Sequence, residues 1–251
     1  MFQEVSVLMP YKPDDGPRDR AFHYIRRFYE RMLPGAQLCI GEDLDEPFSR
    51  SKAINRAASQ ATGRVFVIAD NDLIYHPALL LQSIQRLGKD RWVIPFARIN
   101  RLSEAVSHRI VQEGSGSWPL PVQPDTKPAE ATYFVGGMNV LLRQSFESVG
   151  GYDERFIGWG GEDEAFAYSL DTMVGKHVRL EGELFHFWHP FVGPSGNPHY
   201  DENYKLYLRY KAAWGNPEEM YRLLEEKRKI CKGKGADGED GNEIVGDCSC
   251  P

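Results

Sequence analysis

Three short apolar runs alternate with two helical segments at the start of the chain, and this alternation leaves few folds open. Each run is typical of a buried strand: EVSVLMPY (4–11), AQLCIGE (36–42) and RVFVIAD (64–70). Residues 20–33 and 49–63 carry apolar side chains at helical spacing. This β-α-β-α-β order predicts an α/β fold with a parallel, doubly wound sheet covered by helices. Ligands bind such sheets at the carboxyl ends of the strands.

Beyond residue 70, the same patterns predict further elements around one long polar segment. We expect helices at 77–88, 143–151, 201–214 and 216–229, and strands at 91–99, 132–142 and within 177–190. Residues 103–131 are rich in Gly, Pro and Ser, and they are long for a connection. We interpret them as a mobile functional loop or a disordered insertion.

Composition sets the domain count and excludes some partners. The chain has 251 residues, of which 41% are hydrophobic. We expect one domain over 1–230 and a flexible, Gly-rich, charged tail over 231–251. The net charge is −6 without a basic block, which argues against a nucleic-acid partner. We find no secretion signal and no apolar run near the roughly 20 residues that cross a bilayer, so we expect a cytoplasmic, soluble protein.

The cysteines do not form a disulfide framework. Only Cys39 lies in the body of the chain, where it is most simply a buried strand residue. Cys231, Cys248 and Cys250 lie in the expected tail. They could bind a metal, but one Cys-x-Cys with a distant third cysteine is a weak pattern, and we favour a flexible tail without a metal site.

Two acids stand at the carboxyl end of the third predicted strand. The run VFVIAD is followed by Asn71 and Asp72, so Asp70 and Asp72 stand one residue apart at a strand end. Two carboxylates in this position can share a hard divalent cation. The alternative is an ordinary turn, in which Asp and Asn are common.

Two histidines, His186 and His189, stand three residues apart in ELFHFWHP. Imidazole binds transition-type cations, and a mixed Asp/His set suits manganese better than magnesium. The alternative is a pair of strand histidines that bond to backbone groups, and the histidines alone favour that alternative.

The segment FIGWGGEDE combines an aromatic ring, a diglycine and three acids. Trp159 offers a flat apolar wall, and Gly160 and Gly161 allow the backbone to approach a ligand closely. Glu162 and Asp163 begin a helix, where carboxylates are favoured whether or not they are catalytic. The helix accounts for the acids, but it does not account for the tryptophan and diglycine before them.

A fourth candidate is EPFSRSKAINRA. Phe48 could stack on a base, and Arg50 or Lys52 could reach phosphate or ribose. Alternatively, both cations cover the solvent face of a helix.

In this order, the segments resemble the GT-A glycosyltransferases. The likeness is greatest to the β-1,4-galactosyltransferase family and looser to the polypeptide N-acetylgalactosaminyltransferases, and it runs from about Val5 to Tyr200. FSRSKAIN is similar to the family's Phe-Asn-Arg-Ala-Lys-Leu-Leu-Asn, and FIGWGGEDE to its Trp-Gly-Trp-Gly-Gly-Glu-Asp-Asp. The resemblance implies the GT-A fold, a Rossmann-like nucleotide-diphospho-sugar transferase fold with a mostly parallel central sheet flanked by helices.

The resemblance also implies the site residues. The nucleotide-sugar site would comprise Pro10, Tyr11, Phe48, Arg50, Asp70, Asp72, Gly136, Gly137 and Trp159. The metal ligands would be Asp72, His186 and His189. Trp159 and Glu162 would contact sugar, and Asp163 would be the catalytic base. The chain departs from the family where Tyr11-Lys12 replaces Phe-Arg, Ser49 replaces Asn and His186 replaces Met.

The implied activity is a metal-dependent hexosyltransferase (EC 2.4 type). A sugar would move from a nucleotide-diphosphate donor, expected to be a UDP-sugar, to a hydroxyl of a carbohydrate, glycosylated or protein acceptor. Mn²⁺ is the expected ion, with Mg²⁺ as the alternative. Asp163 would deprotonate the acceptor in a single inverting displacement, while 103–131 and the Trp159 segment could close over the donor. Three alternatives stay open: a retaining transferase, a nucleotide-sugar phosphohydrolase and a non-catalytic carbohydrate-binding derivative.

Overall fold

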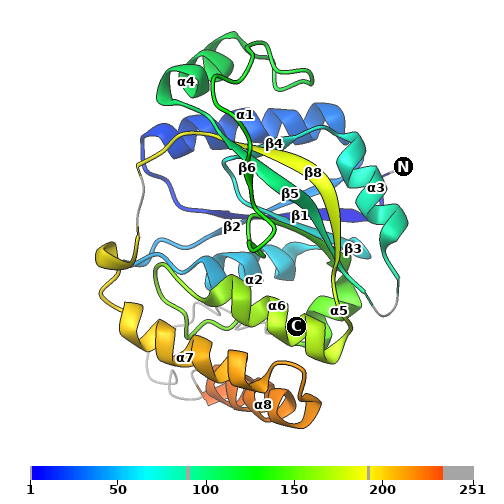
Figure 1. Ribbon diagram of the computed structural model, residues 1–251, viewed down its shortest axis with the longest axis vertical. Helices are drawn as coiled ribbons and strands as arrows, with labels where there is room; N and C mark the ends of the chain where they lie inside the picture. Colours follow the sequence, from blue (N-terminus) through cyan, green and yellow to red (C-terminus); the bar gives the residue numbers. More distant parts are fainter. Residues whose placement is uncertain (1, 89–90, 191–192, 234–251) are drawn as a thin grey trace, which may run out of the picture.

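The structure is a computed structural model that describes residues 2–88, 91–190 and 193–233 (Figure 1). The strands are β1 (Val5–Tyr11), β2 (Gln37–Glu42), β3 (Val65–Ala69), β4 (Leu73–Tyr75), β5 (Val93–Arg101), β6 (Ala129–Glu130), β7 (Met138–Leu142) and β8 (Val178–His186). They form a sheet in the order β2-β1-β3-β7-β5-β8-β4, and β6 pairs with β5.

The helices are α1 (Pro17–Met32), α2 (Arg50–Gln60), α3 (Ala78–Arg86), α4 (Glu104–Glu113), α5 (Arg143–Ser148), α6 (Glu162–Met173), α7 (Tyr200–Ala213) and α8 (Pro217–Gly233), with a short 3₁₀ turn η1 (Pro194–Gly196). Figure 1 shows α1 and α4 on one side of the sheet and α2, α6, α7 and α8 on the other. The sheet is therefore the middle layer of an α/β structure, as the sequence predicts.

The first half follows the predicted β-α-β-α-β order. β1 pairs in parallel with both β2 and β3. Every residue of β1 and β3 is buried, which explains why these strands read as continuous apolar runs. Ser49 caps α2, because its side chain accepts a hydrogen bond from the backbone N–H of Lys52.

The second half makes the sheet mixed. β7 lies between β3 and β5 and runs antiparallel to both, while β8 is parallel to β5. β4, which the sequence patterns did not predict, pairs antiparallel with β8. The expected α/β class with helices flanking the central sheet is confirmed. Ligands of such sheets bind at the carboxyl ends of the parallel strands.

The segment 103–131 differs from its predicted form. Its first part is the helix α4, which Ser103 caps by accepting a hydrogen bond from the N–H of Val106. Val106 and Ile110 are buried at helical spacing, and α4 packs against α1. The interpretation as a loop or disordered insertion is therefore wrong for the helical part. The amphipathic pattern of that part is short, and the composition of the whole segment is dominated by the Gly- and Pro-rich residues that follow it.

Two other boundaries change. The strand predicted at 132–142 begins only at Met138, because the chain first turns, with the N–H of Phe134 donating to the carbonyl of Ala131. α8 continues to Gly233, past the helix end predicted at residue 229, and its buried residues include Met220 and Leu224. The remainder of the predicted tail lies outside the described residues.

The described part of the chain contains no helix long and apolar enough to cross a membrane. Cys39 is a buried free thiol in β2, as expected. The side chain of Cys231, and Cys248 and Cys250 altogether, lie outside the described residues.

Candidate active site

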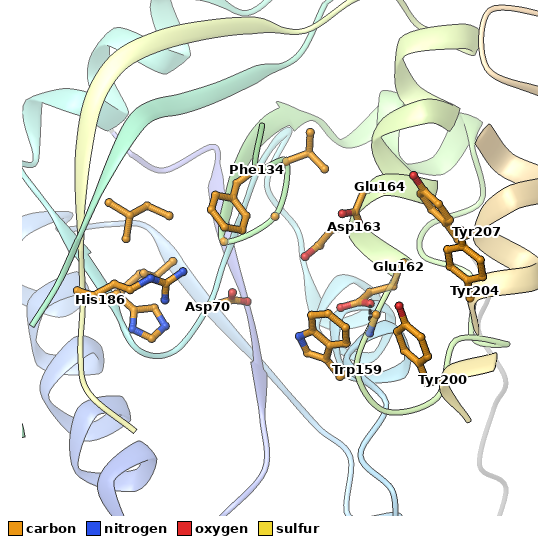
Figure 2. A pocket seen from close by; sticks show the side chains of 18 residues that line it. Asp70, Phe134, Trp159, Glu162, Asp163, Glu164, His186, Tyr200, Tyr204 and Tyr207 are labelled. Atoms are coloured by element: carbon orange, nitrogen blue, oxygen red, sulfur yellow. Dashed lines mark hydrogen bonds between the residues drawn. The ribbon is translucent and has the colours of Figure 1, made fainter. Parts of the chain in front are cut away.

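A cavity of about 350 Å³ lies beside the carboxyl ends of the parallel strands. Its walls include Asp70, Gly136, Gly137, Trp159, Glu162, Asp163 and His186, all predicted as site residues. Figure 2 shows Asp70 and His186 on one side, facing Trp159 and the acids of α6 on the other. The sheet and α6 thus supply opposite walls of one site.

The three predicted metal ligands meet at the sheet edge. β4 pairs with β8 so that Leu73 lies opposite His186, and the N–H of Phe187 donates to the carbonyl of Asp72 at 2.8 Å. His186 Nε2 lies 3.8 Å from Asp72 Oδ1, and His189 Nε2 lies 3.2 Å from Asp72 Oδ2. One ligand atom from each of the three residues lies within 4.8 Å of the other two. The short strand β4 is therefore the element that brings the ligands together.

The chemistry of this cluster fits a divalent cation. Asp72 Oδ1 is buried and has no hydrogen-bond partner among the described residues, so one carboxylate oxygen is available to an ion. Burial lowers the pKa of His186, which favours the neutral imidazole that binds metals. One carboxylate with two imidazoles suits Mn²⁺ better than Mg²⁺, which prefers oxygen ligands.

Arg18 adjoins this cluster, and no sequence pattern pointed to it. Its Nη2 lies 3.0 Å from Nδ1 of His189, so a residue of α1 contacts one of the predicted ligands. A guanidinium only donates, so this contact by itself favours a proton on Nε2 of His189. The carbonyl of Pro190, 2.8 Å from Nδ1, can instead accept from Nδ1–H, which leaves Nε2 free to bind a metal. Because Arg18 and His189 are 171 positions apart, only the folded chain reveals the contact.

Arg50 joins the two walls of the cavity. Its Nε donates to Asp70 Oδ1 at 2.9 Å, and its Nη1 donates to Asp163 Oδ1. The guanidinium also lies 5.7 Å from the ring centroid of Tyr152, whose hydroxyl donates to the same Asp163 oxygen at 3.2 Å. Arg50 is therefore held between carboxylates, whereas the sequence predicted a nucleotide contact.

Asp163 is held close to Gly136 and Gly137, which directly precede β7. A Cβ atom on Gly136 would lie 1.9 Å from Asp163 Oδ2, so only glycine leaves room for this carboxylate. The carbonyl of Gly137 accepts a hydrogen bond from the N–H of Asp70. The glycines predicted to contact nucleotide sugar thus also position Asp70 and Asp163.

Glu162 differs from its neighbour because it is buried without a cationic partner among the described contacts. It is 9% exposed and accepts a hydrogen bond from the N–H of Gly160 at 3.2 Å. Burial and the negative charge of Asp163 raise the pKa of Glu162 to about 8. Glu162 is therefore poised to bind or release a proton near neutral pH.

Two buried asparagines hold the Trp159 segment. Asn203 donates to the carbonyls of Ile157 and Trp159 and accepts from the N–H of Ile157. Asn197 also donates to both carbonyls, at 2.9 and 2.8 Å. Gly161, with φ of +94°, then turns the chain into α6. The sequence patterns did not indicate these asparagines.

The other predicted nucleotide residues do not line this cavity. Tyr11 is buried, its ring lies 4.1 Å from that of Phe22, and its hydroxyl donates to Asp19. Pro10 is buried in β1 opposite Gly41. Phe48 is half-buried, and its carbonyl accepts a hydrogen bond from the N–H of Gly158, which places it beside the Trp159 segment.

Comparisons with known proteins identify two matching families. The model for glycosyl transferase family 2 matches residues 14–150, and that for the N-terminal domain of galactosyltransferase matches residues 123–190. Two curated relatives are 24% identical over 197 residues and 25% identical over 158: the O-antigen biosynthesis protein RfbC of Myxococcus xanthus and "Probable N-acetylgalactosaminyltransferase 9" of Caenorhabditis elegans. These alignments cover 64% and 53% of this chain, but only 16% and 27% of the relatives' lengths.

Similar solved structures include the catalytic domain of Drosophila β1,4-galactosyltransferase 7 (16% identity, TM-score 0.47, 74% of this chain and 71% of that one). Another is the mannosyltransferase PcManGT from Pyrobaculum calidifontis, in complex with GDP-Man and Mn²⁺ (13% identity, TM-score 0.46, 94% and 76%).

The family assignment rests on the family 2 match, which covers more than half of the 251 residues. It confirms the enzyme class predicted from the sequence. This chain belongs to glycosyl transferase family 2, the nucleotide-sugar glycosyltransferases of GT-A fold, and includes a segment of galactosyltransferase type.

Proposed function

We propose that this chain transfers a sugar from a nucleotide-diphosphate donor, a UDP-sugar, to a hydroxyl of a carbohydrate acceptor with inversion at the anomeric carbon. One observation carries the proposal: His186, which belongs to the cluster with Asp72 and His189, lines the same cavity as the acids Glu162 and Asp163. A metal-dependent inverting transferase needs a cation site for the diphosphate and a base for the acceptor on opposite sides of the reacting carbon.

Asp72, His186 and His189 would hold Mn²⁺, with Mg²⁺ as the alternative ion. When bound, the ion supplies Lewis-acid stabilisation of the leaving diphosphate. Asp72 Oδ1, which is buried and finds no hydrogen-bond partner in the described part of the chain, supports this assignment. Phe48 and Arg50 would lie along the nucleotide, and Trp159 would form one wall for a sugar ring.

Asp163 is the proposed base. Arg50 and Tyr152 both bond to Oδ1 and fix the orientation of the carboxylate, while Oδ2 faces the diglycine on the cavity wall. Asp163 would take the proton of the acceptor hydroxyl as that oxygen attacks the anomeric carbon. Positioning by two partners reduces the reorganisation that this step requires.

Glu162 is the second candidate for the base. A pKa of about 8 lies close to the pH at which a general base works efficiently. Under the proposal, Glu162 instead accepts a hydrogen bond from the acceptor sugar.

Product analysis tests the proposal. The purified chain is incubated with Mn²⁺, a panel of UDP- and GDP-sugars and a panel of neutral oligosaccharides, and products are identified by mass spectrometry and NMR. We expect metal-dependent release of nucleoside diphosphate together with a glycoside of inverted configuration. Retained configuration would reject the single displacement, and release of phosphate or nucleotide without any transfer would indicate a phosphohydrolase instead.

A further inference from the structure

A row of aromatic rings leaves the cavity and follows α7. Ring centroids of Trp159 and Tyr200 are 6.1 Å apart, those of Tyr200 and Tyr204 6.2 Å, and those of Tyr204 and Tyr207 5.9 Å. Interplanar angles along these pairs are 19°, 16° and 27°, so successive rings are nearly parallel. Figure 2 shows the four rings in succession along the cavity wall.

The row continues beyond the cavity. Tyr168 of α6 lies 6.2 Å from Tyr207, and Trp214, just after α7, lies 4.9 Å from Tyr168 with an interplanar angle of 29°. We call these six residues the aromatic track: Trp159, Tyr168, Tyr200, Tyr204, Tyr207 and Trp214. It connects the reaction site with the outer surface of α7.

The core of the protein accounts for only part of the aromatic track, because Tyr168 and Tyr207 pack against it but Trp159, Tyr204 and Trp214 remain exposed. Residues 200, 204 and 207 share one helix face, whereas the buried face of α7 carries Leu206, Tyr210 and Ala213. Trp159, Tyr204 and Trp214 are 42%, 48% and 52% exposed. Three exposed large aromatic rings, linked by the partly buried rings of Tyr168, Tyr200 and Tyr207, indicate a binding surface.

The chemistry of the surface indicates carbohydrate. An aromatic ring has a negative face, which attracts the polarised C–H groups on the flat side of a pyranose, and a phenol hydroxyl can bond to sugar hydroxyls. Glu162, Asp163 and Glu164 line the cavity where the track begins, so the reacting end of the ligand carries no negative charge. Four residues of the aromatic track, Tyr200, Tyr204, Tyr207 and Trp214, lie beyond residue 190, where the match to the galactosyltransferase family ends.

We propose that the aromatic track binds a neutral oligosaccharide acceptor, with its reacting residue in the cavity and later residues stacked along α7 toward Trp214. This inference rests on the proposed transferase function. It narrows the acceptor from any hydroxyl compound to a neutral glycan chain of several sugar residues. Residues of α6 and α7 would then determine the preferred length of that glycan.

The rings of the aromatic track are not equally accessible to a ligand. Lys211 Nζ lies 5.8 Å from the Tyr207 ring, so that ring is less accessible than those of Tyr204 and Trp214. Tyr204 and Trp214 are therefore the positions at which the acceptor gains most from stacking.

Binding is tested with neutral oligosaccharides of increasing length. Homologous series of xylose, glucose and N-acetylglucosamine, from mono- to hexasaccharide, are titrated by calorimetry and saturation-transfer NMR with Mn²⁺ and UDP present. In at least one series we expect affinity to rise with length and then level off. Oligogalacturonides, which are anionic, should bind at least tenfold more weakly than neutral chains of the same length.

Matched variants locate the effect. Tyr204→Ala and Trp214→Ala should each weaken binding of the longer chains by about three- to tenfold, the range expected for one stacking partner. Tyr221→Ala is the control, because Tyr221 is 53% exposed but lies on α8, outside the track. UDP and Mn²⁺ binding should be unchanged in all three variants.

The outcomes separate this inference from the proposed function. If UDP and Mn²⁺ bind but no series gains affinity with length, the aromatic track is not an acceptor site. If neither UDP nor Mn²⁺ binds the parent protein, the proposed function fails first. If Tyr204→Ala or Trp214→Ala converts a dimer to a monomer in light scattering, the surface joins two copies of the chain and the inference is overturned.

Discussion

At the scale of single residues, Glu162 and Asp163 show how neighbours acquire different chemistry. Asp163 shares Arg50 with Asp70 and bonds to Tyr152, whereas Glu162 bonds only to a backbone N–H among the contacts described. Adjacent residues of a helix point about 100° apart, so the two carboxylates cannot face one reacting atom equally. Their surroundings therefore support different roles.

Asp163→Asn should lower turnover by roughly 10²–10⁴, because the amide keeps the shape of the side chain but cannot accept the proton. Glu162→Gln should instead raise the KM for the acceptor, with a smaller effect on turnover. Transfer is measured at saturating donor, with Asp201→Asn on the exposed first turn of α7 as the control. Near-normal turnover in Asp163→Asn, with loss in Glu162→Gln, would move the base to Glu162.

The pKa of Glu162 predicts a pH dependence of stability. Burial and the charge of Asp163 raise this pKa to about 8, whereas an unfolded chain has about 4.3. Between these values, the folded state holds a proton that the unfolded state has lost. The free energy of unfolding should therefore fall as pH rises from about 5 to about 8, and Glu162 should contribute no further loss above that.

Glu162→Gln removes this contribution. The variant should be more stable than the parent at pH 8.5 by up to about 5 kcal/mol, and about equal to it near pH 4.5. Urea unfolding at both pH values measures the difference, and Glu218→Gln on the exposed surface of α8 serves as control. Equal pH slopes in the variant and the parent would contradict the raised pKa.

At the scale of elements, α7 restrains the segment that carries Trp159. The sequence suggested that this glycine-flanked segment could act as a hinge. In the structure, Asn197 and Asn203 bond to the carbonyls on both sides of Gly158. Buried backbone groups that lose such partners are costly, so the asparagines fix the tryptophan wall.

Asn203→Ala should lower the free energy of unfolding by about 1–3 kcal/mol, because it leaves backbone groups of Ile157 and Trp159 with fewer partners. It should also raise the acceptor KM while donor binding is unchanged. Asn216→Ala is the control, because Asn216 accepts a hydrogen bond from the N–H of Glu219 at the start of α8, away from the Trp159 segment. An unchanged acceptor KM in Asn203→Ala would show that the restraint has no functional role.

At the scale of the whole molecule, the cation cluster is assembled from distant parts of the chain. Asp72 follows β3, His186 ends β8, and Arg18 of α1 contacts His189. An ion bound here would link β3, β4 and β8. Its binding should therefore stabilise the whole domain and not one loop alone.

Adding Mn²⁺ should raise the apparent stability by about 2.7 kcal/mol once free Mn²⁺ exceeds the Kd about 100-fold. Thermal unfolding with and without chelator measures this gain. His186→Ala should abolish it, whereas His108→Ala, at an exposed position of α4, should not. Equal stabilisation of His186→Ala by Mn²⁺ would place the ion elsewhere.

The sequence by itself determined the elements that depend on local order. The alternation of strands and helices up to residue 70, the acids after β3 and the acid-rich start of α6 all follow from periodicity and position. Such patterns report which face of a strand or helix is buried, and that depends on residues close in sequence. They also carried the resemblance that identified the enzyme class.

Only the tertiary structure decided how these elements meet. The antiparallel position of β7, the pairing of β4 with β8, and the contacts of Arg18 with His189 and of Asn203 with Ile157 join residues far apart in sequence. Arg50 shows the same limit, because its place between Asp70 and Asp163 depends on how α2, β3 and α6 pack. Periodicity fixes which side of each element is buried but not which element covers it, since the order of strands in the sheet is set by the packing of the whole chain.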